Sequence, residues 1–254
     1  MDKRYIQLYS IRDELTKDFE GTLKHVVKMG YTGVEFASGF YGGHSAADLK
    51  KMLENLGLDA IGTHIMSDSV AENLDYVAEL GLRYVIDPMA NILTWEEAKA
   101  FSQKLNEAGK LCKDRGIVFG YHNHHHEFLE GKDGYLLETL LLNTDPDLVC
   151  FQLDVGWATY AGVDATSFIK KYPGRFKLIH VKECSKAVEP GKLQAGFGEN
   201  SWNAATGKGL INWPEVRDAA VAQGAEAFII EREFVYAGDI FSCVKADCEY
   251  LKSL

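Results

Sequence analysis

The sequence predicts a (β/α)8 barrel, in which eight parallel strands alternate with eight helices and close into a ring. Eight short apolar runs alternate with eight amphipathic stretches along the 254 residues, and this order and length are typical of such a barrel. An open doubly wound sheet is disfavoured, because the segment after the first run, QLYSIRDEL, contains no glycine to cradle a phosphate. No linker rich in proline, glycine or serine divides the chain, so we expect one domain over residues 1–254.

The eight apolar runs have the composition of buried strands. They are short and rich in β-branched and aromatic residues, which favour extended backbone in a packed sheet. Helical stretches separate them, as expected for strands that run parallel and are connected by crossovers. The runs begin near Tyr5, Gly33, Asp59, Arg83, Ile117, Val149, Phe176 and Ala227.

The stretches between the runs carry apolar residues three or four positions apart, the spacing of a helix with one buried face. In the first of them this stripe includes Leu23, Val26 and Val27. Glycines such as Gly57 follow several stretches, where a left-handed residue ends a helix, and Thr94 has the side chain of an N-cap. The predicted helices cover residues 19–29, 47–56, 71–80, 95–112, 135–142, 165–171, 213–222 and 240–251.

The longest irregular stretch lies between the seventh and eighth strands, from Cys184 to Asn212. It is rich in glycine, asparagine and serine. Because loops of this length in a compact domain are more often functional than merely connecting, we expect this one to contribute to a site.

The composition excludes several classes of protein. The chain has 27 Lys and Arg against 37 Asp and Glu, a formal net charge of −10, which argues against a broad basic face for nucleic acid. A small phosphorylated substrate needs only one or two cations and remains compatible with this charge. No apolar run is long enough to span a membrane. The five cysteines show no CxxC spacing, so we interpret them as reduced thiols of a cytoplasmic protein.

Polar residues stand at the predicted carboxyl ends of the strands, where barrels of this kind hold their active sites. Carboxylates and imidazoles that converge there need a compensating charge, because burying them unpaired is costly. We therefore expect one divalent ion, and an Asp/Glu/His mixture suits Mn²⁺, Zn²⁺, Co²⁺ or Mg²⁺ better than Ca²⁺. The candidates are Gln7 and Tyr9, Glu35, His64, Asp87, His122 and His124 with Glu127, Gln152 and Asp154, His180 and Lys182, and Glu231 and Glu233.

Several segments at these strand ends carry a family resemblance that follows the chain in order. The most specific are YHNH followed by EF at Tyr121–Phe128, and LDVGWA at Leu153–Ala158. The chain resembles the xylose-isomerase-like barrel superfamily, in particular its sugar phosphate isomerase/epimerase group. The other matching segments are Gln7–Arg12, Gly30–Glu35, Ile179–Glu183, Gly207–Trp213 and Ile230–Glu231.

The resemblance implies one divalent metal ion with a ligand from each of four consecutive strands. At the corresponding positions this chain has Glu127, Asp154, His180 and Glu231. The fifth strand leaves two alternatives, because many relatives have the ligand at the strand end itself, where this chain has His122. We favour Glu127 as the ligand, with His122 as a base or as a support for the ligands.

The resemblance also implies isomerisation or epimerisation of a sugar through a metal-stabilised enediolate. Glu127 (or His122) and Glu231 would then move the proton, and Lys182 and His64 would hold developing oxyanion charge. We expect the substrate to be bound by five residues, namely Tyr9, Glu35, His64, His124 and Trp157.

Two other functions remain open, and a third is excluded. The same proton abstraction followed by β-elimination would make the chain a dehydratase or a lyase acting on 3-keto-glycosides, and a non-enzymatic sugar-binding protein would use the same pocket. The endonuclease branch of the superfamily has a metal-binding histidine three residues after the strand-six aspartate, where this chain has Trp157. We therefore expect a small sugar as partner, with no nucleic acid and no membrane; a homo-oligomer is compatible with the fold.

Overall fold

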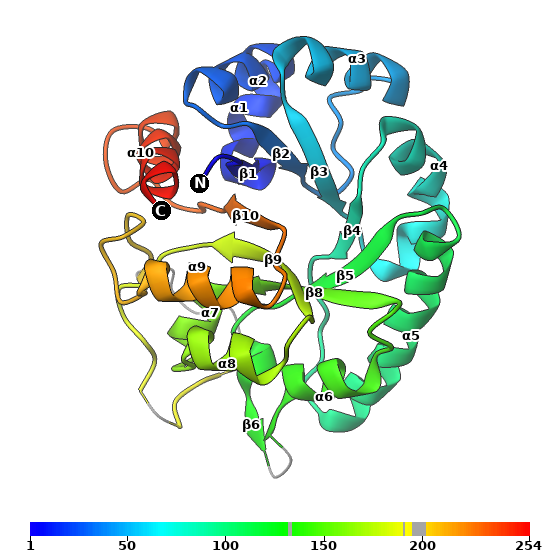
Figure 1. Ribbon diagram of the computed structural model, residues 1–254, viewed down its shortest axis with the longest axis vertical. Helices are drawn as coiled ribbons and strands as arrows, with labels where there is room; N and C mark the ends of the chain where they lie inside the picture. Colours follow the sequence, from blue (N-terminus) through cyan, green and yellow to red (C-terminus); the bar gives the residue numbers. More distant parts are fainter. Residues whose placement is uncertain (132–133, 190, 195–201) are drawn as a thin grey trace.

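Eight parallel strands close into a barrel in the computed structural model, which describes residues 1–131, 134–189, 191–194 and 202–254 (Figure 1). Neighbouring strands around the ring follow the order β1-β10-β9-β8-β5-β4-β3-β2. The eight strands and their predicted order are confirmed. Their bounds are β1 (Tyr5–Gln7), β2 (Gly33–Phe36), β3 (Asp59–His64), β4 (Tyr84–Asp87), β5 (Val118–His122), β8 (Val149–Asp154), β9 (Phe176–Val181) and β10 (Ala227–Ile230).

All eight predicted helices are present, and they lie outside the ring of strands (Figure 1). Their ends follow the expected chemistry: Thr94 and Glu97 form a reciprocal capping box, and Gly57 is left-handed with φ 68°. The bounds are α2 (Phe19–Lys28), α3 (Ala46–Leu56), α4 (Val70–Leu80), α5 (Trp95–Lys113), α6 (Leu136–Asn143), α8 (Ala165–Lys171), α9 (Trp213–Ala222) and α10 (Ile240–Ser253).

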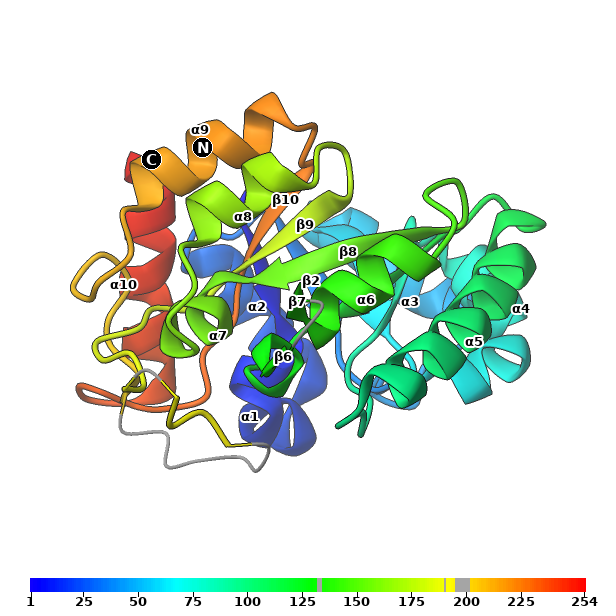
Figure 2. The ribbon, with the colours of Figure 1, turned by 90° about the horizontal axis from the view of Figure 1, so that it is seen from below.

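Several short elements were not predicted, because one or two turns carry too little periodicity to be recognised. Figure 2 shows α1, α7 and the β6–β7 hairpin on one side of the barrel, the lower side in that view. The helix α7 directly follows β8, and the side chain of Asp154 forms its N-cap. These elements are η1 (Leu8–Ile11), α1 (Arg12–Lys17), η2 (Ser67–Ser69), η3 (His126–Phe128), β6 (Glu130–Gly131), β7 (Gly134–Tyr135) and α7 (Val155–Tyr160).

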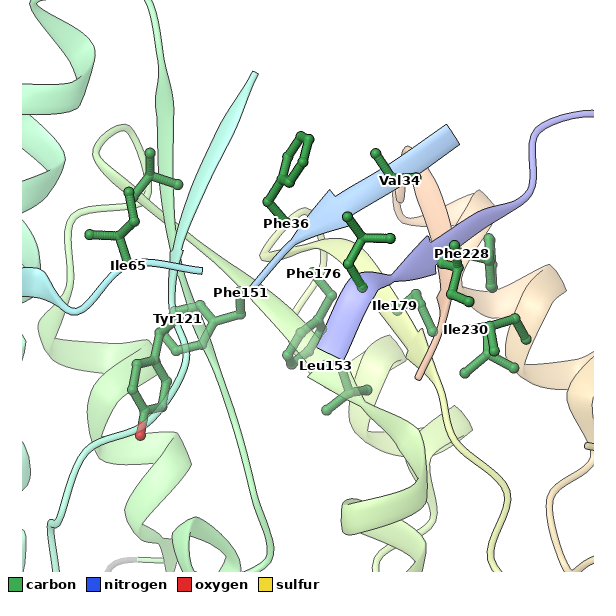
Figure 3. Packing of buried hydrophobic residues seen from close by; sticks show 14 of the residues in the cluster. Val34, Phe36, Ile65, Tyr121, Phe151, Leu153, Phe176, Ile179, Phe228 and Ile230 are labelled. Atoms are coloured by element: carbon green, nitrogen blue, oxygen red, sulfur yellow. The ribbon is translucent and has the colours of Figure 1, made fainter. Parts of the chain in front are cut away.

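Alternating side chains along the strands build two apolar cores. Outward-facing residues such as Phe151, Leu153 and Ile230 pack between the strands and the helices (Figure 3). Inward-facing residues of the same strands fill the barrel, and polar residues follow them toward the carboxyl ends. The interior cluster consists of Tyr5, Ile61, Tyr84, Ile86, Cys150, Leu178, Ala227 and Ile229.

The pairing of β8 with β9 contains a register shift. Phe151 pairs with Phe176, whereas the next residue, Gln152, pairs with Leu178, so one residue of β9 has no counterpart. Beyond the shift, Asp154 pairs with His180. Both side chains therefore lie on the inner face, at neighbouring positions of adjacent strands.

The described end of the Cys184–Asn212 loop is fixed by one buried carboxylate; residues 190 and 195–201 of this loop lie outside the described residues. Glu183 accepts hydrogen bonds from the backbone N–H groups of Cys184 and Gly207 at 3.0 and 2.7 Å. It also accepts one from the indole N–H of Trp213 at 2.8 Å. Glu183, two residues after β9, thus ties the loop to the start of α9.

A buried ion pair anchors the chain just after β10. The guanidinium of Arg232 donates to both carboxylate oxygens of Asp247 in α10, and both residues are buried. Asp247 also accepts from the backbone N–H and the hydroxyl of Thr206.

In the part of the chain that the structure describes, no helix has both the length and the apolar character that crossing a membrane requires.

Candidate active site

Four buried side chains at the carboxyl ends of neighbouring strands converge on one point. One ligand atom from each of the four lies within 4.8 Å of the others, so a single ion can reach them all. The order of their strands around the ring is β5, β8, β9 and β10. This group, called the ligand group below, consists of His122, Asp154, His180 and Glu231.

A fully buried carboxylate lies beneath the ligand group and contacts side chains of four other strands. Glu35 of β2 accepts hydrogen bonds from Nε2 of His180 at 2.7 Å and from the amide of Gln152 at 2.6 Å. It also accepts from the amide of Gln7 at 2.8 Å, and Nε2 of His64 lies 3.3 Å away. Glu35 is therefore a support for the histidines, and it does not line the cavity that the ligand group faces.

These bonds fix where the protons of the neighbouring imidazoles lie. Because the Gln152 amide nitrogen donates to Glu35, its oxygen must accept, and it does so from Nδ1 of His122 at 3.1 Å. Nδ1 of His122 then carries the proton, and its Nε2, 4.0 Å from Asp154, presents a lone pair to the ligand group. In the same way, Glu35 holds Nε2 of His180 and leaves Nδ1 toward Glu231 at 3.3 Å.

The charges of the His180–Glu35 pair support each other. Burial disfavours the charged imidazole, but the carboxylates of Glu35 and Glu231 outweigh it and, without an ion, raise the pKa of His180 to about 10, so a bound ion would take the place of the proton on Nδ1. Burial likewise disfavours the Glu35 carboxylate, yet His64 and His180 hold the pKa of that carboxyl well below its usual range. Glu35 is thus ionised and acts only as an acceptor.

Lys182 supplies a buried positive charge next to the ligand group. Its ammonium lies 2.8 Å from Glu231, 2.8 Å from Glu233 and 3.4 Å from Asp154. Burial opposes this charge, but the three carboxylates outweigh it and raise the pKa of Lys182 well above its usual value. Lys182 therefore stays protonated and serves as a cation and hydrogen-bond donor, whereas a basic role would need the neutral amine.

Asp154 divides its two oxygens between structure and the ligand group. Oδ1 accepts the backbone N–H of Trp157 at 2.8 Å and so caps α7. Oδ2 is buried and has no hydrogen-bond partner among the described residues, although the ammonium of Lys182 lies 3.4 Å from it. A buried carboxylate oxygen without a hydrogen bond is costly, and an ion held by the ligand group would satisfy it. The residues present therefore fit a divalent metal ion.

A cavity of about 450 Å³ opens above the ligand group at the barrel mouth. Four of the five side chains predicted to bind substrate line it, namely Tyr9, His64, His124 and Trp157. His122 and Glu231 of the ligand group also line it, together with the further carboxylate of Glu233. Burial lowers the pKa of His124 well below the usual value for histidine, which keeps this ring neutral.

Glu127 does not join the ligand group. The strand β5 ends at His122 and the chain turns into η3, so the regular alternation that would carry His122, His124 and His126 on one face does not continue. The Glu127 carboxylate accepts from the hydroxyl of Tyr121 at 2.5 Å and from the backbone N–H of His124 at 2.9 Å. It fixes the loop that carries His124, and the fifth strand contributes His122 to the ligand group instead.

Some residues of the site were not singled out from the sequence. Gln152, which orients His122 and His64, stands in the sequence only as a strand-end residue, because an amide two residues before an aspartate carries no strong signal of its own. Met66, Pro88 and Met89 line the cavity from loops after β3 and β4. Their place in the chain, two or fewer residues past a predicted strand end, is the signal that could have identified them.

The fold and the ligand group define a barrel with His, Asp and Glu side chains at its mouth that could hold a metal ion. Residues 23–253 match the model of the xylose isomerase-like TIM barrel family, and the chain belongs to that family. The predicted fold and family are thereby confirmed.

Several of the proteins that this chain resembles are named as enzymes. A sugar phosphate isomerase/epimerase of Parabacteroides distasonis has a solved structure with a TM-score of 0.83 and 28% identity, covering 100% of this chain and 94% of that one. An L-ribulose 3-epimerase matches in fold, with a TM-score of 0.74, 14% identity and coverage of 100% and 94%. An inosose dehydratase of Clostridium perfringens is 34% identical over 95 residues, 37% of this chain and 31% of that relative's length.

Proposed function

We propose that this chain is a divalent-metal-dependent isomerase or epimerase that removes a proton from the carbon beside a carbonyl of a sugar or keto-sugar. The observation that carries the proposal is the ligand group itself: two imidazoles and two carboxylates within 4.8 Å of one another, at the floor of a cavity at the barrel mouth. The solved isomerase/epimerase that covers the whole chain at 28% identity supports the same reaction class.

His122, Asp154, His180 and Glu231 would hold the ion, with His122 in the position that the sequence assigned to Glu127. When bound there, a divalent ion supplies Lewis acidity toward the oxygens of the sugar. The mixture of imidazole and carboxylate ligands favours Mn²⁺, Zn²⁺ or Co²⁺ over Mg²⁺. Glu35 and Gln152 keep the two imidazoles in the orientation that the ion requires.

The proton is handled by groups on the cavity wall. Glu231 and Glu233 line the cavity and share the ammonium of Lys182, which holds both carboxylates in place. We assign the abstraction to Glu231, whose carboxyl then carries the proton and returns it to the substrate, while the neutral imidazole of His124 hydrogen-bonds the sugar. Lys182 offsets the negative charge that develops on the substrate. Glu127 is then a positioning residue for His124.

A second candidate is a dehydratase or lyase, in which the same abstraction is followed by β-elimination. It is favoured by the inosose dehydratases among the curated relatives, which match up to 67% of this chain at 24% identity. Both candidates begin with removal of the same kind of proton, so they share every residue role assigned above except the return of that proton. Product analysis separates them.

The test combines metal content with solvent deuterium exchange. Purified protein should hold about one equivalent of divalent ion by elemental analysis, and it should incorporate deuterium into at least one member of a panel of ketoses and 3-keto sugars. Asp154→Asn and His180→Ala should lose both properties while their circular dichroism spectra stay unchanged. Exchange that continues at full rate in metal-free protein would contradict the proposal.

One pair of variants decides the fifth-strand ligand. His122→Ala should lower metal affinity at least tenfold, whereas Glu127→Gln should retain the ion and slow exchange by displacing His124. The reverse result would restore Glu127 as the ligand. A fully metal-loaded protein that binds sugars and exchanges no deuterium with any of them would support a non-enzymatic sugar-binding protein instead.

A further inference from the structure

The cavity has one polar side and one apolar side. The polar side is the part above the ligand group, described earlier. The opposite side, called the methionine shelf below, consists of Tyr9, Met66, Pro88 and Met89. Tyr9, Met66 and Met89 keep 42%, 45% and 39% of their surface exposed, although each is large and apolar. Three exposed apolar side chains that meet in one cavity differ from the singly scattered ones that soluble proteins tolerate.

The shelf is held in place by buried polar contacts. The fully buried carboxylate of Asp87, at the end of β4, accepts from the backbone N–H of Ser67 at 2.8 Å and of Met89 at 3.2 Å. One side chain thus fixes the loop after β3, which carries Met66, to the loop after β4. The ring of Tyr9 is fixed from another side, because the guanidinium of Arg12 lies 4.2 Å from its centroid and donates to its carbonyl. Surface that is preorganised in this way binds without a large ordering cost.

The charges around the cavity disfavour an anionic substrate. Within the described chain, the lining contains two carboxylates, Glu231 and Glu233, and no lysine or arginine. Lys182 lies beneath them and is already shared among three carboxylates. A phosphate on the shelf side of the cavity, away from the ligand group, would meet no lysine or arginine of the lining, whereas phosphate sites in proteins present arginine, lysine or clustered N–H groups.

We propose that the substrate is an uncharged keto-glycoside whose aromatic aglycone lies on the methionine shelf while its keto-sugar faces the ligand group. This inference rests on the proposed function and narrows its substrate class. Methionine sulfur makes favourable contacts with aromatic rings, and its flexible side chain adapts to rings of different shape. The shelf and the ligand group bound the same cavity, so one molecule can contact both.

Binding of unreactive glycosides tests this proposal without requiring turnover. The probes are phenyl and methyl glycosides of glucose, galactose, mannose and xylose, and glucose 6-phosphate, titrated calorimetrically into metal-loaded protein. At least one phenyl glycoside should bind about tenfold more tightly than its methyl partner, because burying the apolar ring increases the affinity by about that much. Equal binding within every pair, binding of none of the phenyl members, or tightest binding of the phosphate would overturn it.

Variants locate the effect. Met66→Ala and Met89→Ala should each weaken the phenyl glycoside roughly threefold to tenfold and leave the methyl glycoside within about twofold. Leu142→Ala is the matched control, because Leu142 is an exposed apolar residue of α6 that lies outside the cavity lining. Met66→Lys should supply the absent cation and raise affinity for glucose 6-phosphate. Equal effects of all three alanine variants would show that the methionine shelf does not bind the aglycone.

Different results contradict the proposed function and the proposed role of the methionine shelf. Deuterium exchange into keto sugars without a phenyl preference would leave the proposed function standing and reject the shelf. Phenyl preference that depends on Met66 and Met89, with no exchange into any keto sugar, would support the shelf and reject proton abstraction.

Discussion

Nε2 of His180 donates a hydrogen bond of 2.7 Å to the carboxylate of Glu35, which lies 145 residues earlier in the chain. The contact crosses the barrel interior, because β9 and β2 are not neighbours in the ring. It settles which nitrogen of His180 faces the ligand group and, through Gln152, which nitrogen of His122 does so. One carboxylate therefore sets the orientation of two proposed ligands from below.

We expect Glu35→Gln to weaken metal binding about tenfold to a hundredfold, the usual cost of losing a support of a ligating histidine. A glutamine amide can donate as well as accept, so it competes with the imidazole and amide donors that now meet at Glu35. Metal affinity measured with a chromophoric chelator gives the result. Unchanged affinity would show that the ligands keep their orientation without this carboxylate.

Glu183→Gln is the control for Glu35→Gln, because Glu183 is also a buried carboxylate but does not contact the ligand group. Among the described residues its hydrogen-bond partners are all N–H donors, including those of Gly207 and Trp213. In the glutamine variant the amide NH₂ would face one of these donors, and a hydrogen bond would be lost. We expect the free energy of unfolding to fall by about 2 kcal/mol in urea titrations, with metal affinity unchanged. If Glu183→Gln weakened metal binding as much as Glu35→Gln does, a general loss of stability would explain the lower metal affinity of both variants.

Breaking the buried pair of Arg232 and Asp247 should cost more than replacing it. Arg232→Met or Asp247→Leu alone leaves an uncompensated charge, and we expect each to lower the free energy of unfolding by about 3–5 kcal/mol. The double variant should recover much of this loss, because neither charge remains. Strictly additive losses in a double-mutant cycle would contradict this account.

Acid should act on the fold partly through Glu138 of α6. Burial opposes its charge, but hydrogen bonds from Lys171, Tyr172 and the backbone of Tyr135 outweigh it, so the pKa of Glu138 is lowered. A carboxyl with a lowered folded pKa stabilises the fold above its unfolded pKa, and this contribution is lost as the pH falls through the folded value. Glu138→Gln should therefore cost about 1 kcal/mol at pH 7 and converge with the parent at acidic pH.

Urea titrations at pH 7 and pH 3 measure this convergence. Glu107→Gln is the control, since Glu107 is exposed on α5, and it should leave stability unchanged at both values. A constant difference between Glu138→Gln and the parent at the two pH values would show that the charge of Glu138 is not what stabilises α6.

The sequence predicted the eight strands and eight helices because burial imposes a period on residues such as Leu23 and Phe151. It also predicted Asp154, His180 and Glu231 as a group, since parallel strands bring their carboxyl ends together. The choice between His122 and Glu127 depended on where β5 ends, and that end is set by a turn with no periodicity.

Glu35 illustrates a second limit. The sequence placed it at a strand end and predicted that it binds substrate, whereas in the structure it lies one layer below the cavity. The height of a residue in a barrel depends on the stagger between strands, which no single strand encodes. The methionine shelf was not predicted for a related reason, because Met66 and Met89 meet only through the contacts of Asp87.

The register shift in β9 decides which face of the strand carries His180. In a regular pairing without the shift, Asp154 would stand opposite Ile179, which belongs to the outer core, and the imidazole of His180 would leave the barrel mouth. Deleting Lys177 removes the residue without a counterpart and should leave Asp154 opposite His180, whereas inserting one residue between Leu178 and His180 should turn the imidazole away although every ligand is still encoded. A single insertion within a strand can therefore abolish a reactive centre by turning the residues beyond it to the other face.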